Sequence, residues 1–255
     1  MSLLLRATLT LFLFMQIMPA NLHAQSIGDE GDFRRISKLI EQQNIEVAFD
    51  EIKKLQAGKS KLTAKSQALM GLIYLELAQP SKAYAVVEKV TFTSTEMDHI
   101  AEAGMAKAQL MLGNLSQARD FAESAHTRNP DELLTKVALA SVLSEQLLHS
   151  RSDKVFEEAM RASRQSSLAG RMYASALQRR SQLSEAEAVI KQTLIKQGKD
   201  GPTLVLYSEL LWDMGKFEQA LDLRIEAEAL FRKAGNTIMA EEVLAWMNVE
   251  AIPTL

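Results

Sequence analysis

Apolar residues along this chain recur three and four positions apart, the spacing that places side chains on one face of an α-helix. The pattern also repeats at long range. The stretch GNLSQARDF at 113–121 returns as GKFEQALDL at 215–223, an offset of 215 − 113 = 102 positions, or three periods of 34. Periods of this length are typical of arrays of helix pairs. The sequence therefore predicts an all-α fold built from a repeated unit.

Two columns of this repeat consist of small residues, with Ile36 as the one exception. The first column, at intervals of 35, 35, 34, 34 and 34, holds Ala48, Ala83, Ala118, Ser152, Ala186 and Ala220. The second column, twelve positions earlier, holds Ile36, Gly71, Ala106, Ala140, Ala174 and Ser208. Large side chains would hold two helix axes further apart than the usual distance of about 8–10 Å. We therefore expect paired helices to pack closely through these columns.

The columns divide the chain into six units after a short linker at 25–28. The predicted units are 29–63, 64–98, 99–132, 133–166, 167–200 and 201–234. Turns are expected at Gly113 and Gly215, and Pro202 suits the first turn of a helix. Ser184 with Glu187 predicts a capping box that opens the second helix of its unit.

Residues 235–255 predict a closing helix and a tail. The last unit of an array exposes a face that needs a cover. Asn236 can cap this helix, and its expected apolar face holds Ile238, Leu244 and Met247.

The repeat resembles the tetratricopeptide repeat. Unit 99–132 carries the resemblance through Ala106, Gly113, Ala118, Ala125 and Pro130, and unit 201–234 through Tyr207, Leu211, Gly215, Phe217, Ala220 and Ala227. Unit 29–63 departs from the pattern at Arg35 and Ile36, and unit 133–166 has no turn glycine. Pentatricopeptide repeats bind RNA, and Sel1-like repeats need a longer glycine-rich turn, so both fit this acidic chain less well. The resemblance implies a right-handed α-solenoid of about six helix pairs, whose first helices line a concave groove.

The first 24 residues have the three-part pattern of a secretory signal. Arg6 precedes an uncharged apolar run of 14 residues, and Leu22 and Ala24 stand at −3 and −1 of a cleavage point after Ala24. The alternative is retention as a membrane anchor, but a run of 14 residues is shorter than the roughly 20 that a spanning helix needs. The sequence contains no cysteine, so no thiol is available for a lipid anchor. We therefore expect an exported protein, in a bacterial periplasm.

Charge and motifs argue against several function classes. The net charge is −3, and removing residues 1–24 makes it (29 − 1) − 32 = −4, so binding of nucleic acid is not expected. His99, His126 and His149 are far apart in the sequence and are expected to be solvated. The phosphate-loop motif would need a glycine where Lys53 stands. These observations predict a protein that is not an enzyme and holds no metal or cofactor.

The resemblance assigns a partner-binding groove to the first helix of each unit. Its expected lining is Leu72, Leu75, Lys107, Leu110, Met111, Arg171, Gln178, Arg179 and Trp212. For Leu75, Leu110 and Trp212, core packing and partner binding are equally open. Lys107, Arg171 and Arg179 are expected to face the same groove, and Arg171 and Arg179 are expected to select acidic residues of a partner.

One variant of the family holds C-terminal carboxylates through Lys and Asn at fixed positions. The asparagine column of that variant holds here Ser37, Leu72, Lys107, Ser141, Ser175 and Glu209. The carboxylate clamp is therefore not expected. The predicted function is a non-catalytic adaptor for a protein or peptide in the bacterial envelope, by family analogy within a secretion, pilus or polysaccharide-export assembly. The alternative is a self-associating scaffold that forms homo-oligomers.

Overall fold

The protein is an all-α helical repeat. The computed structural model describes residues 31–32, 35–36, 38–40, 43–57, 64–91, 98–163 and 166–250. In these ranges the helices are α2 (Ile45–Ala57), α3 (Ala64–Glu76), α4 (Pro80–Thr91), α5 (Asp98–Met111), α6 (Leu115–Arg128), α7 (Leu133–Glu145), α8 (His149–Ala162), α9 (Leu168–Arg179), α10 (Leu183–Gln197), α11 (Gly201–Asp213), α12 (Phe217–Lys233) and α13 (Thr237–Glu250). The predicted signal sequence, the linker and the last five residues lie outside the described residues. The predicted α-solenoid with a closing helix is confirmed.

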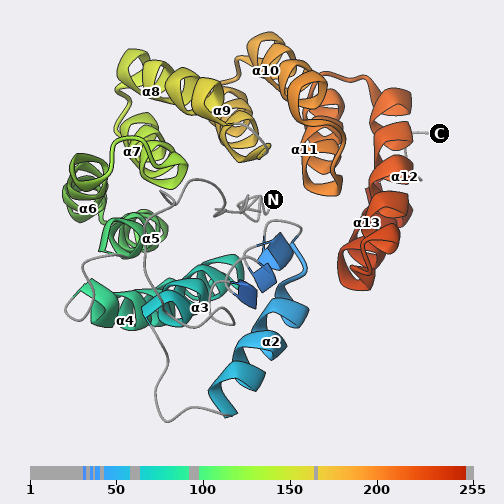
Figure 1. Cartoon of the computed structure of the whole chain (residues 1–255). Helices are drawn as coiled ribbons and strands as arrows, with labels where there is room; N and C mark the ends of the chain where they lie inside the picture. Colours follow the sequence, from blue (N-terminus) through green and yellow to red (C-terminus); the bar gives the residue numbers. More distant parts are fainter. Residues whose placement is uncertain are drawn as a thin grey trace.

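The helices follow a curve in two layers (Figure 1). From α3 to α12, the odd-numbered helices lie on the inner side of the curve and the even-numbered helices on the outer side. Consecutive helices contact each other, and α3, α5, α7, α9 and α11 also contact one another in succession. The inner helices thus form one continuous layer. Among the described residues, no helix has the length and apolar character needed to cross a bilayer.

The two columns of small residues form the contact between the layers. All six residues of the first column are 0% exposed. Where that column carries Ser152, its hydroxyl donates a 2.8 Å hydrogen bond to the carbonyl of Ala140 in the second column, so the buried polar group is paired. A Cβ on Gly71 would lie 2.2 Å from Cγ1 of Val87, so the helices approach too closely there for any side chain. The predicted close packing is confirmed.

The turns inside the units repeat a left-handed backbone conformation rather than a residue type. Positive φ recurs at Gln43 (57°), Ala78 (53°), Gly113 (79°), Leu147 (62°), Ser181 (59°) and Gly215 (73°). At each turn the next N–H reaches back five residues, as from Asn114 to the carbonyl of Gln109 (2.9 Å) and from Leu148 to that of Leu143 (2.9 Å). The same turn therefore forms with or without glycine at the left-handed position, and in unit 133–166 it forms at Leu147.

Replacing Leu147 with Gly is expected to stabilise the protein by about 1 kcal/mol, measured by urea denaturation. A residue with a Cβ is strained at positive φ, whereas glycine is not, and this gain exceeds the entropy that glycine adds to the unfolded chain. Leu147 is 74% exposed, so little packing is lost. Leu147→Ala retains the strain and serves as the control. Equal stabilities of the Gly and Ala variants would contradict this account.

The starts of two helices test the capping predictions. Pro202 lies in the first turn of α11, and the Asp200 carboxylate accepts the backbone N–H of Thr203 at 2.8 Å, so the expected place of the proline is confirmed. The capping box at Ser184 is wrong. The N-cap of helix α10 is Gln182, two residues before Ser184, and it makes no side-chain cap. Glu187 instead accepts hydrogen bonds from side chains of the next unit.

The closing helix α13 packs on α12 with a face that matches the expected one only in part. Asn236 accepts the N–H of Met239 at 3.2 Å, so its predicted capping role is confirmed. That start directs Ala240 (0% exposed) and Val243 (1%) into the core and leaves Ile238 40% exposed. The helix was predicted correctly. Of its expected apolar face, Met247 packs against the core, whereas Ile238 is exposed.

Candidate partner-binding face

One face of α9 occupies the middle of the inner layer. Arg171, Ser175, Gln178 and Arg179 are spaced at i, i+4, i+7 and i+8 and therefore share this face. The Gln178 amide donates to a carboxylate oxygen of Asp213 on α11 (2.6 Å). On the other side, the guanidinium of Arg179 lies 3.0 Å from the Glu145 carboxylate on α7. The face thus lies between its two inner neighbours, and the structure brings three predicted groove residues together on it.

Arg179 and Lys107 are both paired within the protein. The Arg179 guanidinium also donates to the Ser175 hydroxyl (3.0 Å), and its side chain is 47% exposed. Lys107 is more enclosed: its ammonium lies 2.9 Å from the Glu76 carboxylate, and the two side chains are 9% and 5% exposed. Expected as an open groove cation, Lys107 instead forms a buried ion pair that links α3 to α5.

The apolar residues predicted for the groove divide into two groups. Leu72 (3% exposed) and Leu75 (0%) lie in the hydrophobic core, so core packing decides the question left open for Leu75. Their side chains offer no surface to a partner. Leu110 and Met111 are half-buried and pack against the same core, which leaves part of each side chain accessible.

Trp212 lies in an aromatic cluster beneath the closing helix. Its ring contacts Phe217 and Trp246 edge-to-face, with centroids 4.7 and 4.9 Å apart. The Arg224 guanidinium lies 4.2 Å above the Trp246 ring and 3.1 Å from the Glu209 carboxylate. Sequence reasoning missed Trp246 and Arg224, because neither follows the repeat. The presence of Trp246 within the predicted closing helix was the sequence feature that could have pointed to this cluster. The half-buried Trp212 side chain is held largely by this cluster.

Glu187 forms the most connected acidic site between the last two units. Its carboxylate accepts the Tyr207 hydroxyl (3.1 Å) and lies 2.8 Å from the Lys191 ammonium and 2.9 Å from that of Lys216. The hydrogen bond from Lys191, followed by that from Lys216, lowers the pKa of Glu187 from 4.5 to about 2. Tyr207 lies on α11 and Lys216 is the N-cap of α12, so this carboxylate links α10 to both parts of the last unit.

This pKa predicts an acid-dependent loss of stability. Because the folded pKa of Glu187 lies below the unfolded value, its contribution is complete above pH 4.5 and disappears as pH falls toward about 2. Urea denaturation at pH 6 and at pH 3 should show that Glu187→Gln is less stable than the parent at pH 6 and closer to it at pH 3. Glu185→Gln is the neighbouring control. A gap between Glu187→Gln and the parent that does not narrow in acid would contradict the assignment.

Arg171 is the only predicted groove cation without a partner among the residues that the structure describes. Its side chain is 0% exposed and is the largest fully buried side chain in that part of the chain. The three guanidinium nitrogens make no hydrogen bond there. Arg171 was expected on an open surface, whereas the structure encloses it.

Solved structures share this architecture. TTC0263, a thermophilic TPR protein of Thermus thermophilus, is 19% identical, with a TM-score of 0.56 over 72% of this chain and 100% of that chain. A tetratricopeptide repeat protein of Parabacteroides merdae is 13% identical, with a TM-score of 0.57 over 87% and 86%. The chain has a tetratricopeptide-repeat (TPR) fold. The Cut9–Hcn1 hetero-tetramer of the APC/C matches at 11% identity and a TM-score of 0.62, over 86% of this chain and 46% of that chain. No protein-family model and no curated protein matches the sequence.

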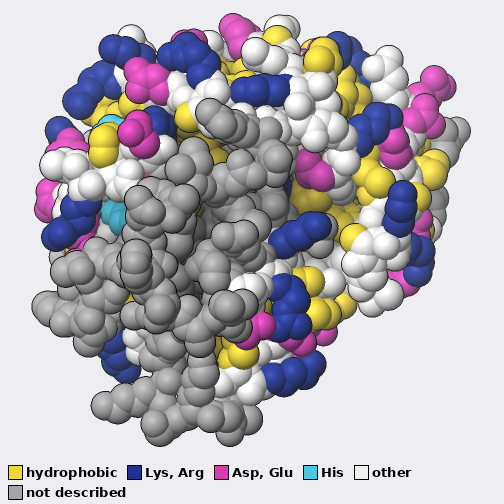
Figure 2. Space-filling view, viewed as in Figure 1, with side chains coloured by type: hydrophobic (Ala, Val, Ile, Leu, Met, Phe, Trp, Pro, Cys, Tyr) yellow, Lys and Arg dark blue, Asp and Glu magenta, His cyan; other side chains and the backbone are white. Residues whose placement is uncertain are grey.

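Charges of both signs are mixed on the TPR surface. In Figure 2, positive and negative side chains alternate over the part of the visible face that the described residues form. Exposed pairs such as Arg119 with Glu123 and Lys199 with Glu226 are examples of this mixing. A phosphate backbone is held by clustered cations, and this part of the surface presents no extended positive area.

The three histidines do not meet in the TPR array. They are half-buried rather than solvated as expected. Burial is the main cause that lowers the pKa of His99 and of His126. The His99 ring lies 3.4 Å from the Asn129 amide, which belongs to the next inter-unit connection. Within the described ranges, no three His, Cys, Asp or Glu side chains come together as a metal site.

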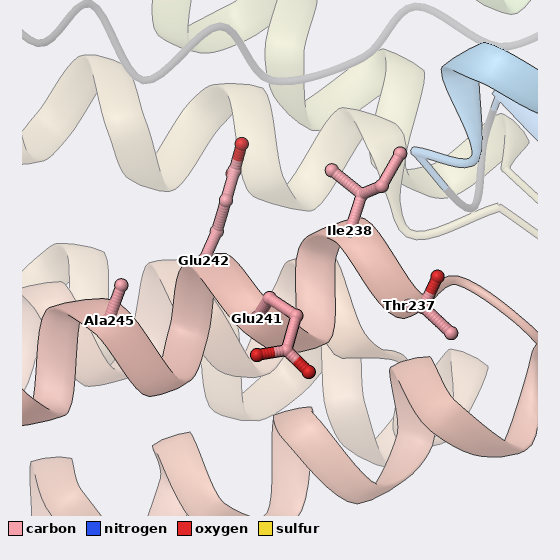
Figure 3. A pocket seen from close by; sticks show the side chains of 5 residues that line it. All are labelled: Thr237, Ile238, Glu241, Glu242 and Ala245. Carbon is pink, nitrogen blue, oxygen red and sulfur yellow. The ribbon is translucent and has the colours of Figure 1, made fainter.

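A hollow of about 410 Å³ lies on α13 at the end of the TPR array. Its lining is Thr237, Ile238, Glu241, Glu242 and Ala245. Figure 3 shows Ile238 and Glu242 directed to one side of the helix and Glu241 to the other. All five lining residues lie on the closing helix, so this hollow is separate from the face of α9.

Proposed function

We propose that this protein is a non-catalytic scaffold that holds a peptide segment of a protein partner along its inner helices. The observation that carries the proposal is the contrast between columns. The packing column is small and buried in every unit. One accessible column of the inner helices instead changes from Met111 to Glu145, Arg179 and Asp213, at intervals of 34 positions. Packing needs a repeated residue, whereas recognition of one partner needs side chains that differ from unit to unit.

The proposed setting is the bacterial envelope. The export pattern of residues 1–24 supports it, with cleavage after Ala24 and release into the periplasm without a lipid anchor. A secretion, pilus or polysaccharide-export assembly is the proposed context. Within such an assembly the array would position a partner and would require no cofactor.

Site-specific photo-cross-linking of the full chain in its native cells tests this function. A photoreactive residue at Gln178, on the inner face, is expected to give a discrete adduct with one partner protein. The same residue at Ile195, which is 87% exposed on the outer helix α10, is the control and should give none. Equal adducts at both positions, or none at Gln178, would contradict binding on the inner face. The N-terminal sequence of the recovered protein, expected to begin at Gln25, tests export.

Exposure of Ile238 favours self-association as a second candidate function. This side chain is 40% exposed in the hollow on the last helix, where another array could stack. Light scattering across a concentration series would then show a mass that rises with concentration and returns to the monomer in Ile238→Glu. A monomeric mass at every concentration would reject this candidate.

A further inference from the structure

The buried Arg171 guanidinium is an energetic problem for the free protein. It is 0% exposed, and its three nitrogens lack a hydrogen-bond partner among the residues that the structure describes. Arginine does not lose its proton in proteins, so the group cannot escape the cost by becoming neutral. Buried polar groups in native structures are paired, and an exception indicates a missing ion, water or ligand. The guanidinium therefore points to an anion that binds here.

The carboxylates on the flanking inner helices are already engaged. Glu145 of α7 pairs with Arg179, and Asp213 of α11 accepts from Gln178. Glu209, also on α11, pairs with Arg224. Each has a defined partner other than Arg171. Because the described carboxylates of α7 and α11 are engaged elsewhere, we assign the anion to a bound molecule.

A second unsatisfied donor lies on the neighbouring inner helix. Ser141 of α7 is 6% exposed, and its hydroxyl has no hydrogen-bond partner within the described residues. Ser141 and Ser175 occupy the same column of the repeat, 34 positions apart, and the Ser175 hydroxyl already accepts from Arg179. Since α7 and α9 are in contact, Ser141 adds a hydroxyl to the layer that contains Arg171.

We infer that Arg171, with Ser141, receives the side-chain carboxylate of one Asp or Glu in the bound peptide. This inference rests on the proposed function. A single unpaired guanidinium matches the single charge of a carboxylate, and its planar fork donates two parallel hydrogen bonds. The lysine and asparagine clamp for a chain terminus is missing, so the carboxylate is assigned to a side chain. The flexible Arg171 side chain turns toward the peptide, because pairing removes the cost of its unpaired burial.

Selection from a randomised linear peptide library tests the inference. Peptides that bind the full chain are expected to share one Asp or Glu position. Synthetic forms with amidated ends should lose affinity by about 10-fold to 100-fold when that residue becomes Asn or Gln, the effect of one charged hydrogen-bonded contact. In Arg171→Met this loss should shrink to less than about threefold. In Ser141→Ala, the fold-loss in affinity caused by this Asp-to-Asn or Glu-to-Gln change should be several-fold smaller than in the parent, but still measurable.

Arg179→Met is the matched control, because Arg179 lies on the same face of α9 but is exposed and paired with Glu145. It should keep the acidic preference. Two results would overturn the inference but not the scaffold function. The first is that the binding peptides share no acidic position, and the second is that the acidic preference is unchanged in Arg171→Met. A preference for a free C-terminal carboxylate would also overturn it. If no peptide binds, the proposed peptide-binding function fails, and the inference fails with it.

Thermal unfolding separates loss of binding from loss of fold. Methionine matches the length of the arginine stem and needs no anion, so Arg171→Met should melt at a higher temperature than the parent. A melting temperature several degrees below that of the parent would mean that the guanidinium stabilises the free protein, which would overturn the inference.

Discussion

Replacing Lys107 with Met is expected to destabilise the protein by about 3–5 kcal/mol, one of the largest effects available in this chain. Its ammonium lies 2.9 Å from the Glu76 carboxylate, and both side chains are nearly enclosed between α3 and α5. Removal of the cation leaves a carboxylate that is buried and has lost its neutralising charge. Denaturation in urea at neutral pH measures the loss.

The double variant Lys107→Met with Glu76→Leu identifies the cause of this effect. Replacing a buried ion pair with apolar side chains of similar volume is often neutral, so the second change should recover most of the lost stability. Arg119→Met is the control, because its pair with Glu123 is exposed and should contribute less than about 1 kcal/mol. A stable Lys107→Met protein that has lost its partner would instead support the original groove assignment.

Phe156→Ala is expected to cost about 3–5 kcal/mol and to separate the unfolding of the two halves of the array. The ring is 0% exposed in the middle of the solenoid and stacks on Tyr173 with centroids 5.2 Å apart. It joins α8 to α9. Because each unit of a repeat array is stabilised by its neighbours, a weak central junction should allow the two ends to unfold independently.

Circular dichroism during thermal unfolding should therefore change from one transition to two in Phe156→Ala. Phe156→Leu keeps most of the buried area and should lower stability by less than half as much. Ile195→Ala, at an 87% exposed position, is the surface control and should change stability by less than about 0.5 kcal/mol. A single sharp transition in Phe156→Ala would contradict the proposed role of this junction.

The packing could be predicted from the sequence because it depends on residue size at a fixed period. Ala118 and Ala220 are fully buried, as their columns required. At Ser152, where the column holds serine in place of alanine, the buried hydroxyl is satisfied by a hydrogen bond to the Ala140 carbonyl, so the close packing is kept. The second helix of each unit can therefore be placed from sequence by the close approach that its small residue permits.

The inner face could be predicted only in part. Repeat position identifies which residues share a face, and it brought Arg171, Gln178 and Arg179 together correctly. It does not identify their partners. The ion pair of Lys107 leaves no trace in the local sequence, because Glu76 lies 31 positions earlier, on another helix. The burial of Arg171 depends equally on the three-dimensional arrangement, which a single unit does not reveal.

The left-handed turns have a consequence for how such chains diverge. The reversal between helices is preserved at Ala78 and Leu147 without glycine, at a cost of about 1–2 kcal/mol for each residue with a Cβ. That cost is small compared with the packing on either side of the turn. Successive duplications of a unit can therefore lose their glycines by mutational drift while the course of the backbone remains. In such a lineage the spacing of the left-handed residues is retained although the amino acids at those positions differ, as they do among the units of this chain.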